Sequence, residues 1–381
     1  MKKHIKHAAI PIARIGEFHR NEFAILGTPC SEIKKLSYAL IKELNAWNIG
    51  YVDADHKSAD EPTANENTAL YYGGGSEYID KINFHRHDQN RSLNKFDFQQ
   101  KFIAEDLVFV NGNHFLAKKQ IVVIDSKKPL DKKLDRLTDV ALILFQKDEP
   151  SVPDFLKEFL PSIESIPTFL ISDTVKIAAF ISSQLIQPQL KGLVLAGGKS
   201  TRMSTDKGKL NYHGKQQRLY MQELLSEYTS DSFVSIRNDQ THEFDSNIKT
   251  VSDVFEGLGP YGGILSAFQN DPNSAWLVTA CDQPYLTRQA IELLVKRRNP
   301  SKFATAFYNS ETDFPEPLIT IWEPRAYSRL LYFLSLGYSC PRKVLINSEI
   351  ELVKLEDETV LKNVNTPEEK EAYETNLAQL K

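Results

Sequence analysis

The sequence predicts an α/β protein made of two doubly wound, mostly parallel sheets in series. Two stretches, beginning near Glu22 and Lys191, each open with a short apolar strand, a glycine-containing turn and a helical pattern. This order is typical of the start of an α/β unit on a parallel sheet. The length of 381 residues supports the same division, since roughly 150 residues per domain gives two or three compact units.

In the first half, the run EFAILG (22–27) is the expected opening strand, and a helix is expected over 31–47. Apolar residues recur in that helix at near-helical spacing, and Ser31 is a suitable N-cap. The strand IGYVDAD follows the helix directly. Later strands are expected at 106–112, 119–125, 141–146 and 167–172.

The domain boundary is expected in the segment IQPQLK (186–191), which contains a proline and follows a helical pattern. We therefore divide the chain into residues 1–187 and 188–381. In the second domain, strands are expected at 192–196, 233–237, 275–280, 303–308, 317–322 and 350–355. Helices are expected at 215–228, 261–269, 287–297, 324–336 and 366–379.

Composition argues against a nucleic-acid or membrane partner. Lys plus Arg number 46 against 50 Asp plus Glu, so no global basic field attracts a phosphate backbone. Three widely spaced cysteines, Cys30, Cys281 and Cys340, fit neither a disulfide framework nor a CxxC zinc site. No apolar run approaches the roughly 18 residues of a membrane span, and the N-terminal apolar stretch is too short for a secretory signal. We expect a cytoplasmic protein.

The clearest chemistry lies at the start of the second domain, in GLVLAGGKSTRMSTDKGKL. The small residues Ala196, Gly197 and Gly198 allow backbone N–H groups to approach a nucleotide, because no bulky side chain intervenes. Cations that would neutralise its phosphates follow closely, at Lys199, Arg202, Lys207 and Lys209. By composition alone, the same stretch is equally a Gly-Gly turn with a solvated basic loop.

Three further segments favour a nucleotide site. Asp282 follows the apolar strand in AWLVTACDQP, and ligand-binding residues of open α/β sheets gather at the carboxyl ends of strands. A carboxylate there is able to hold Mg²⁺. A second glycine-rich turn, VFEGLGPYGGILSAF (254–268), suits close approach to a base or ribose. In KNVNTPEEKEAY, Asn363 and Asn365 precede a helix start signalled by Thr366 and Pro367.

These segments resemble a known family. LAGGKSTRMSTDK, GPYGGILSAF, CDQP and NVNTPEE occur in the order and spacing of the molybdenum cofactor guanylyltransferases, within the larger group of nucleotidyltransferases. PEPLITIW (315–322) and YSCPRKVL (338–345) also resemble pieces that follow in that family. The resemblance covers nearly all of 190–381 and implies a Rossmann-like nucleotidyltransferase domain.

The resemblance implies a reaction. The terminal phosphate of molybdopterin, or of its molybdenum-loaded form, attacks the α-phosphorus of GTP, releases pyrophosphate and forms a guanine dinucleotide cofactor, with Mg²⁺ required. Because the attacking group is already an anion, no strong general base is needed. Catalysis is expected to rest on in-line positioning and charge neutralisation.

The resemblance also implies roles for individual residues. The catalytic residues are expected to be Arg202, Lys207 and Asp282, with Arg202 and Lys207 on the phosphates. The metal ligands are expected to be Asp282 and, as a second candidate, Asn365. The nucleotide contacts are expected at Leu195, Ala196, Gly197, Gly198, Lys207, Asn238, Asp253 and Asp282.

Some features depart from the family or leave more than one interpretation open. Ser204 and Thr205 stand where relatives have glycine after the Arg-Met pair, a difference within the phosphate-binding loop. Arg218 is either an extra cation on the pterin side or a solvated helix-face arginine. LAGG rather than LAAG favours guanine over cytosine. The competing functions are a CTP-dependent cytidylyltransferase, a sugar-phosphate nucleotidyltransferase and a noncatalytic cofactor carrier, and intact Lys207 and Asp282 argue against the carrier.

The first domain looks like a degenerate P-loop domain. Its strand-to-helix turn reads GTPCSEIKKL, whereas a working loop needs GxxxxGK[ST]. Glu32, Ile33 and Lys34 replace the second glycine, the lysine and the hydroxyl residue, and a carboxylate there repels phosphate. Residues 22–125 resemble the small GTP-binding adaptor protein of molybdopterin-guanine dinucleotide biosynthesis. That resemblance implies a fused adaptor that docks or orients the cofactor or a client molybdoenzyme.

Histidines in the first domain offer a metal hypothesis. HRH places His85 and His87 on one face of a strand, which suits metal ligands and solvated polar positions alike. Asp53, Asp55 and His56 form either a cation site or a polar turn at a strand end. His114 is the fourth histidine of this group.

Overall fold

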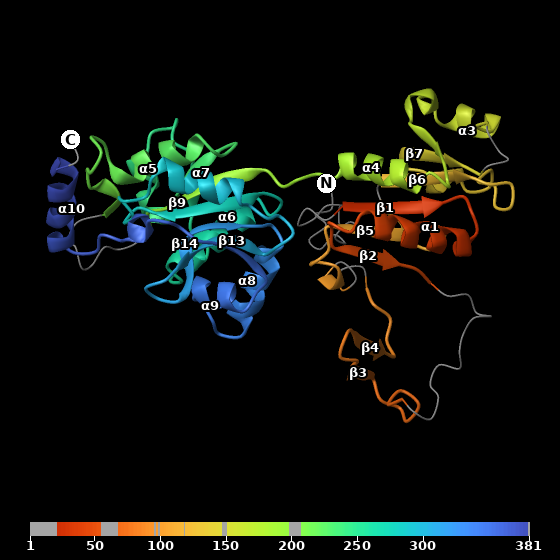
Figure 1. The fold of residues 1–381 in the computed structure, drawn as a ribbon, viewed down its shortest axis with the longest axis horizontal. Coiled ribbons are helices and arrows are strands. Elements are labelled where there is room, and N and C mark those ends of the chain that lie inside the picture. Colours follow the sequence, from red (N-terminus) through yellow and green to blue (C-terminus); the bar gives the residue numbers. More distant parts are fainter. Residues whose placement is uncertain are drawn as a thin grey trace, which may run out of the picture. The chain divides into compact units, whose positions relative to one another are not determined.

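The computed structural model describes residues 21–54, 68–94, 97, 100–117, 119–146, 151–197 and 207–379. These residues form two compact units, one ending at Leu185 and the other beginning at Ile186 (Figure 1). Both units are α/β, which confirms the predicted fold class. Within the described ranges, no helix is long and apolar enough to cross a membrane.

The N-terminal unit is built on a six-stranded sheet in the order β2-β5-β1-β6-β7-β8. Every pairing in this sheet is parallel. The strands are β1 (Asn21–Leu26), β2 (Ile49–Val52), β5 (Leu107–Asn111), β6 (Lys119–Ile124), β7 (Asp139–Phe145) and β8 (Thr168–Leu170). The strands that follow β1 in the chain, β2 and β5, lie on one side of it, and the later strands β6, β7 and β8 lie on the other side. The direction of strand addition therefore reverses at β1, as in a doubly wound fold.

Helices cover both faces of this sheet. α1 (Cys30–Glu43) and α4 (Thr174–Gln184) bury their apolar stripes in one core, and the short α3 (Asp154–Phe159) contributes to the other. Short 3₁₀ turns lie at Leu134–Arg136 and Ile163–Ser165. The predicted N-cap is wrong: α1 already begins at Cys30, so Ser31 lies in its first turn, and Pro29 precedes the helix without a side-chain cap.

A separate antiparallel hairpin, β3 (Ser76–Asp80) and β4 (His85–Gln89), lies between β2 and β5 in the chain (Figure 1). His85 and His87 are exposed on β4, where the Tyr78 hydroxyl lies 2.8 Å from His85 Nδ1. The described residues contain no group of three or more His, Cys, Asp or Glu that could hold a metal ion. Asp53 accepts hydrogen bonds from Tyr51 and Asn111, while Asp55 and His56 lie outside the described residues.

The C-terminal unit contains a seven-stranded mixed sheet in the order β11-β10-β9-β12-β14-β13-β15. β14 runs antiparallel to both of its neighbours, and the other pairings are parallel. The strands are β9 (Leu190–Leu195), β10 (Ser232–Ile236), β11 (Thr250–Ser252), β12 (Ala275–Ala280), β13 (Ala304–Asn309), β14 (Phe314–Trp322) and β15 (Ile350–Val353). β11 was not predicted, because three residues are too short to show an alternating pattern.

Two cores lie on the two faces of this sheet. α5 (Gln217–Ser226) and α7 (Arg288–Lys296) pack on one face, and α6 (Pro260–Asn270), α8 (Ala326–Ser335) and α9 (Pro341–Ile346) pack on the other. α10 (Pro367–Gln379) begins where Thr366 and Pro367 predicted a helix start. Short 3₁₀ turns lie at Lys207–Lys209, Asn238–Glu243 and Glu358–Leu361. This arrangement leaves the carboxyl ends of β9, β10, β11 and β12 on one edge of the sheet.

Candidate active site

A cavity of about 1040 Å³ lies at this edge of the C-terminal sheet. Because β9 to β12 are mutually parallel, their carboxyl ends and the loops that follow them meet there. The start of α6 and one side chain of β14 complete the wall. The lining residues are Leu195, Ala196, Gly197, Lys207, Ser235, Arg237, Asn238, Asp239, Asp253, Glu256, Gly257, Gly259, Pro260, Gly263, Ala280, Cys281, Asp282, Leu318 and Asn365.

Gly197, which follows β9, lines this cavity. A Cβ atom built on Gly197 would meet no described atom closer than 3.5 Å, so protein packing does not require a glycine there. The Gly197 carbonyl accepts a hydrogen bond from Arg237 Nη1 at 2.8 Å, which fixes the orientation of that carbonyl. Two of the predicted residues, Gly198 and Arg202, lie outside the described part of the chain, as does Lys199.

Lys207, Asp282 and Asn365 converge on one point of the wall although they are far apart in the sequence. Lys207 Nζ donates to Asn365 Oδ1 at 2.6 Å and to Asp282 Oδ2 at 3.3 Å. The Lys207 and Asp282 side chains are only 16% and 21% exposed. The segment before α10 is held against the end of β12 by a hydrogen bond from Val364 N to the Asp282 carbonyl at 2.8 Å. The structure thus brings together three of the residues that the family resemblance implied.

The oxygens of this cluster fit a small divalent cation. Asp282 Oδ1 is buried and has no hydrogen-bond partner within the described residues. The other oxygen of this carboxylate, Oδ2, accepts a hydrogen bond from Lys207 Nζ. The same Nζ also donates to the amide oxygen of Asn365. Mg²⁺ prefers oxygen ligands and usually takes only one or two carboxylates from the protein, completing its shell with water and substrate phosphates. Asp282 and Asn365 therefore suit the role that the sequence suggested.

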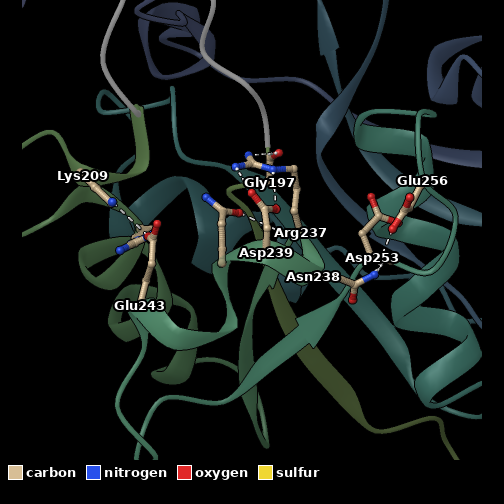
Figure 2. Close-up of polar contacts among 10 residues, drawn as sticks. Gly197, Lys209, Arg237, Asn238, Asp239, Glu243, Asp253 and Glu256 are labelled. Carbon is tan, nitrogen blue, oxygen red and sulfur yellow. Dashed lines mark hydrogen bonds and ion pairs between the residues drawn. The ribbon is translucent and has the colours of Figure 1, made fainter.

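Asn238 and Asp253 also line the cavity, and Figure 2 shows them close to Glu256. Asp253 Oδ1 accepts hydrogen bonds from Phe255 N at 3.0 Å and Ser266 Oγ at 2.9 Å, so this carboxylate braces the loop after β11. Asn238 Nδ2 donates to Glu256 Oε1 at 3.0 Å. Both predicted residues are thus at the site.

Close packing of α6 against the sheet shapes the same wall. A Cβ atom on Gly263 would lie 2.6 Å from Leu195 Cδ2 and 2.9 Å from Ser235 Oγ, distances that real Cβ contacts do not reach. The glycine therefore lets the first turn of α6 lie directly on β9 and β10. This packing places the N-terminal end of the helix beside the cavity.

Three lining residues, Arg237, Asp239 and Glu256, were not expected from the sequence (Figure 2). Arg237 donates to Asp239 from Nε at 3.0 Å and from Nη2 at 3.3 Å. Hydrogen bonding to Arg237 lowers the pKa of the Asp239 carboxyl. Arg237 and Asp239 flank Asn238 at the end of β10, and that position is the signal that would have pointed to them.

Lys209 and Arg218 do not line the cavity. Glu243 forms an ion pair with Lys209, whose Nζ lies 3.1 Å away (Figure 2). Glu243 also pairs with Arg218, whose Nη1 lies 3.0 Å away. Arg218 is 3% exposed, and its guanidinium lies 4.2 Å from the centre of the Phe244 ring. The interpretation of Arg218 as a solvated helix-face residue is therefore wrong. Hydrogen bonds from Arg218 and Lys209 lower the pKa of the Glu243 carboxyl.

Comparison with known proteins shows that the C-terminal unit is similar to nucleotidyltransferases. Residues 192–350 match the family model described as the MobA-like NTP transferase domain. A molybdenum cofactor biosynthesis bifunctional protein of Synechocystis is 35% identical over 184 residues, which are 48% of this chain and 53% of that protein. The chain thus spans about half the length of this relative. A molybdenum cofactor guanylyltransferase of Shewanella is 25% identical over 197 residues, 50% of this chain and 98% of the relative.

Two solved structures are each similar to part of the chain. Molybdopterin-guanine dinucleotide biosynthesis protein A from Archaeoglobus fulgidus covers 50% of this chain and 99% of its own, with 20% identity and a TM-score of 0.43. A molybdopterin-guanine biosynthesis protein B covers 43% of this chain and 98% of its own, with 17% identity and a TM-score of 0.30.

Proposed function

We propose, since residues 192–350 match the model of the MobA-like NTP transferase domain, that this chain transfers GMP from GTP to molybdopterin or its molybdenum-loaded form and releases pyrophosphate. The observation that carries the proposal is the convergence of Lys207, Asp282 and Asn365 on the wall of the cavity. A site that transfers a nucleotidyl group needs a cation, a metal ligand and room for a nucleotide at one place. These residues offer all three.

The chemistry asked of the protein is mainly electrostatic. Lys207 supplies a positive charge that is largely removed from solvent, where its attraction to phosphate oxygens is strong. Asp282 and Asn365 would hold Mg²⁺, which when bound neutralises phosphate charge and aligns the transferring group. The acceptor phosphate is already an anion, so the site needs no residue to remove a proton from the nucleophile.

The turn at Gly197 and the loops after β10 and β11 would bind the nucleoside. Gly197 lines the cavity, and protein packing does not require a glycine there. Asn238 and Asp253 belong to the same lining as Lys207. In this arrangement, the base and ribose lie near α6 and the phosphates extend toward Asp282. Arg202 is proposed to bind the phosphates as well, although it lies outside the described residues.

The test is direct. The full-length protein is incubated with molybdopterin, Mg²⁺ and each of the four ribonucleoside triphosphates, and the product is identified by its mass. Our proposal expects the guanine dinucleotide and pyrophosphate with GTP. A cytosine dinucleotide would assign the chain to CTP-dependent transfer. In a parallel incubation with a sugar phosphate in place of molybdopterin, transfer to that acceptor alone would make the chain a sugar-phosphate nucleotidyltransferase. Molybdopterin that stays bound to the protein without any release of pyrophosphate would make it a cofactor carrier.

For residues 1–187 we propose an adaptor role without ordinary nucleotide hydrolysis. Protein groups already satisfy one another in the loop after β1. Thr28 Oγ1 donates to Asp125 Oδ2 at 2.6 Å, and Cys30 Sγ lies 3.4 Å from His114 Nε2 and 3.8 Å from Lys128 Nζ. The role proposed is docking or orienting the cofactor or a client molybdoenzyme. Deleting 1–187 should lower cofactor delivery to a client enzyme, and unchanged delivery would refute the role.

A further inference from the structure

We infer that Glu256 is the residue that selects guanine among the bases, an inference that rests on the function proposed above and deepens it. Glu256 lines the cavity together with Asn238 and Asp253, the residues proposed above to bind the nucleoside. It belongs to the loop that connects β11 to α6. Figure 2 shows Glu256 beside Asp253 and joined to Asn238 by a hydrogen bond.

The loop that carries Glu256 is fixed from both ends. Asp253 Oδ1 holds Phe255 N at 3.0 Å, and the Phe255 side chain packs against the core under α6. A Cβ atom on Gly262 would lie 2.3 Å from the Phe255 carbonyl oxygen, so helix and loop are in direct contact. The chain then turns at Gly257, whose φ is +80°. A carboxylate on such a loop is positioned before a ligand arrives, which limits the ordering cost of binding.

The Asn238 side chain orients the Glu256 carboxylate. Asn238 Nδ2 donates to Glu256 Oε1 at 3.0 Å and lies 3.5 Å from the Asp253 carbonyl. A carboxylate has several acceptor positions and no donor when ionised, so one hydrogen bond from Asn238 leaves it able to accept more. The structure thus places an oriented acceptor next to Asn238, one of the residues proposed to bind the nucleoside.

An acceptor of this kind discriminates among the bases. Guanine presents two adjacent donors, N1–H and the 2-amino group, which match the two oxygens of one carboxylate. Cytosine presents a single amino donor beside the N3 acceptor, so a carboxylate that binds the amino group meets repulsion from N3. A site built to hydrogen-bond a donor rejects analogues that lack it, because its polar groups then remain unpaired. Glu256 therefore favours guanine over cytosine without any contact to the phosphates.

The experiment tests the contact between Glu256 and guanine from both sides: one set of measurements changes the base, and the other changes the Glu256 carboxylate. Isothermal titration calorimetry on the full-length protein, without acceptor, gives Kd for GTP, for ITP, which lacks the 2-amino group, and for CTP. The variants are Glu256→Gln, Glu256→Asp and, as a control, Glu292→Gln. Glu292 is an exposed carboxylate on α7 that does not line the cavity. Circular dichroism verifies that each variant is folded.

In the wild type, and equally in Glu292→Gln, GTP should bind about tenfold more tightly than ITP, as expected for one hydrogen bond to a charged group. In Glu256→Gln, GTP binding should weaken about tenfold while ITP binding changes less than about threefold, and Glu256→Asp should retain part of the preference. An unchanged ratio of GTP to ITP affinity in Glu256→Gln overturns the inference.

Failure of the proposed function would look different. In that case GTP would bind with the expected preference over ITP, but no guanine dinucleotide would form when molybdopterin and Mg²⁺ are added. A wild-type protein that binds no nucleotide would overturn both proposals.

Discussion

Replacing Lys207 with alanine removes the one described cation that contacts both Asp282 and Asn365. Its Nζ atom lies 3.3 Å from Asp282 Oδ2 and 2.6 Å from Asn365 Oδ1, and its side chain is 16% exposed. The substitution leaves the metal ligands in place. It therefore tests the charge of Lys207 separately from metal binding.

The size of the effect follows from the burial of the site. A cation about 4 Å from a phosphate oxygen gains about 4 kcal/mol at an effective dielectric constant of about 20, which suits a partly buried pair. Part of this attraction is already present when GTP is bound, so only the remainder lowers the barrier. We expect kcat to fall by about 10² to 10³-fold, or about 2.7 to 4 kcal/mol, as when a main electrostatic stabiliser is removed.

Pyrophosphate release in the presence of GTP, Mg²⁺ and molybdopterin measures this loss. The matched control is Lys209→Ala, because Lys209 has the same charge two residues away but pairs with Glu243 and does not line the cavity. Because Lys209 does not line the cavity, the control should keep kcat within about fivefold. The loss of its exposed ion pair should cost only about 0 to 1 kcal/mol of folding stability. A Lys207→Ala protein that is folded and retains the wild-type kcat would refute the reasoning.

Three further predictions concern the metal, the glycines and a buried ion pair. Asp282→Asn should lower kcat about 10²-fold or more and raise the Mg²⁺ concentration that gives half-maximal rate, whereas an unchanged Mg²⁺ titration would contradict its role as a ligand. Gly197→Ala should leave the melting temperature nearly unchanged, because the new Cβ would meet no described atom closer than 3.5 Å. The same substitution should weaken GTP binding about tenfold or more, because the Cβ would occupy space that the nucleotide needs for its close approach to the backbone. Gly263→Ala should instead destabilise the fold by about 1 to 3 kcal/mol, because its Cβ would overlap with side chains of β9 and β10. Equal effects of the two on denaturant unfolding would be inconsistent with the geometry. Glu243→Gln should destabilise the protein by about 1 to 3 kcal/mol at pH 7, because it leaves Arg218 buried beside a neutral partner. The folded-state pKa of Glu243 is lowered by Arg218 and Lys209, so its stabilisation is present above the unfolded-state pKa and disappears as pH falls through the folded-state pKa. The difference in stability between Glu243→Gln and wild type should therefore shrink as the pH falls from about 7 to below the ordinary glutamate pKa of about 4.3. A difference of equal size at both ends of this range would argue against the ion pair.

Most of the fold could be predicted because it depends on local pattern. Strands such as β9 and β12 are long apolar runs, and their burial in the sheet interior matches that composition. Elements without a strong pattern were missed, including β11, which has three residues. The N-cap prediction at Ser31 failed because helix propensity alone does not decide between adjacent starting residues. Pro29 fixes the entry of the chain instead.

By itself, the sequence determined the order of the strands along the chain, the Gly-Gly turn and the candidates Lys207, Asp282 and Asn365. These are properties of short motifs, which keep their meaning wherever the motif is placed. The tertiary structure alone decided that Lys207 contacts Asp282 and Asn365, and that Arg218 is buried against Glu243. It also decided that Glu256 lines the cavity. Such contacts join residues from separate loops, and they exist only once parallel strands have aligned their carboxyl ends at one edge of the sheet.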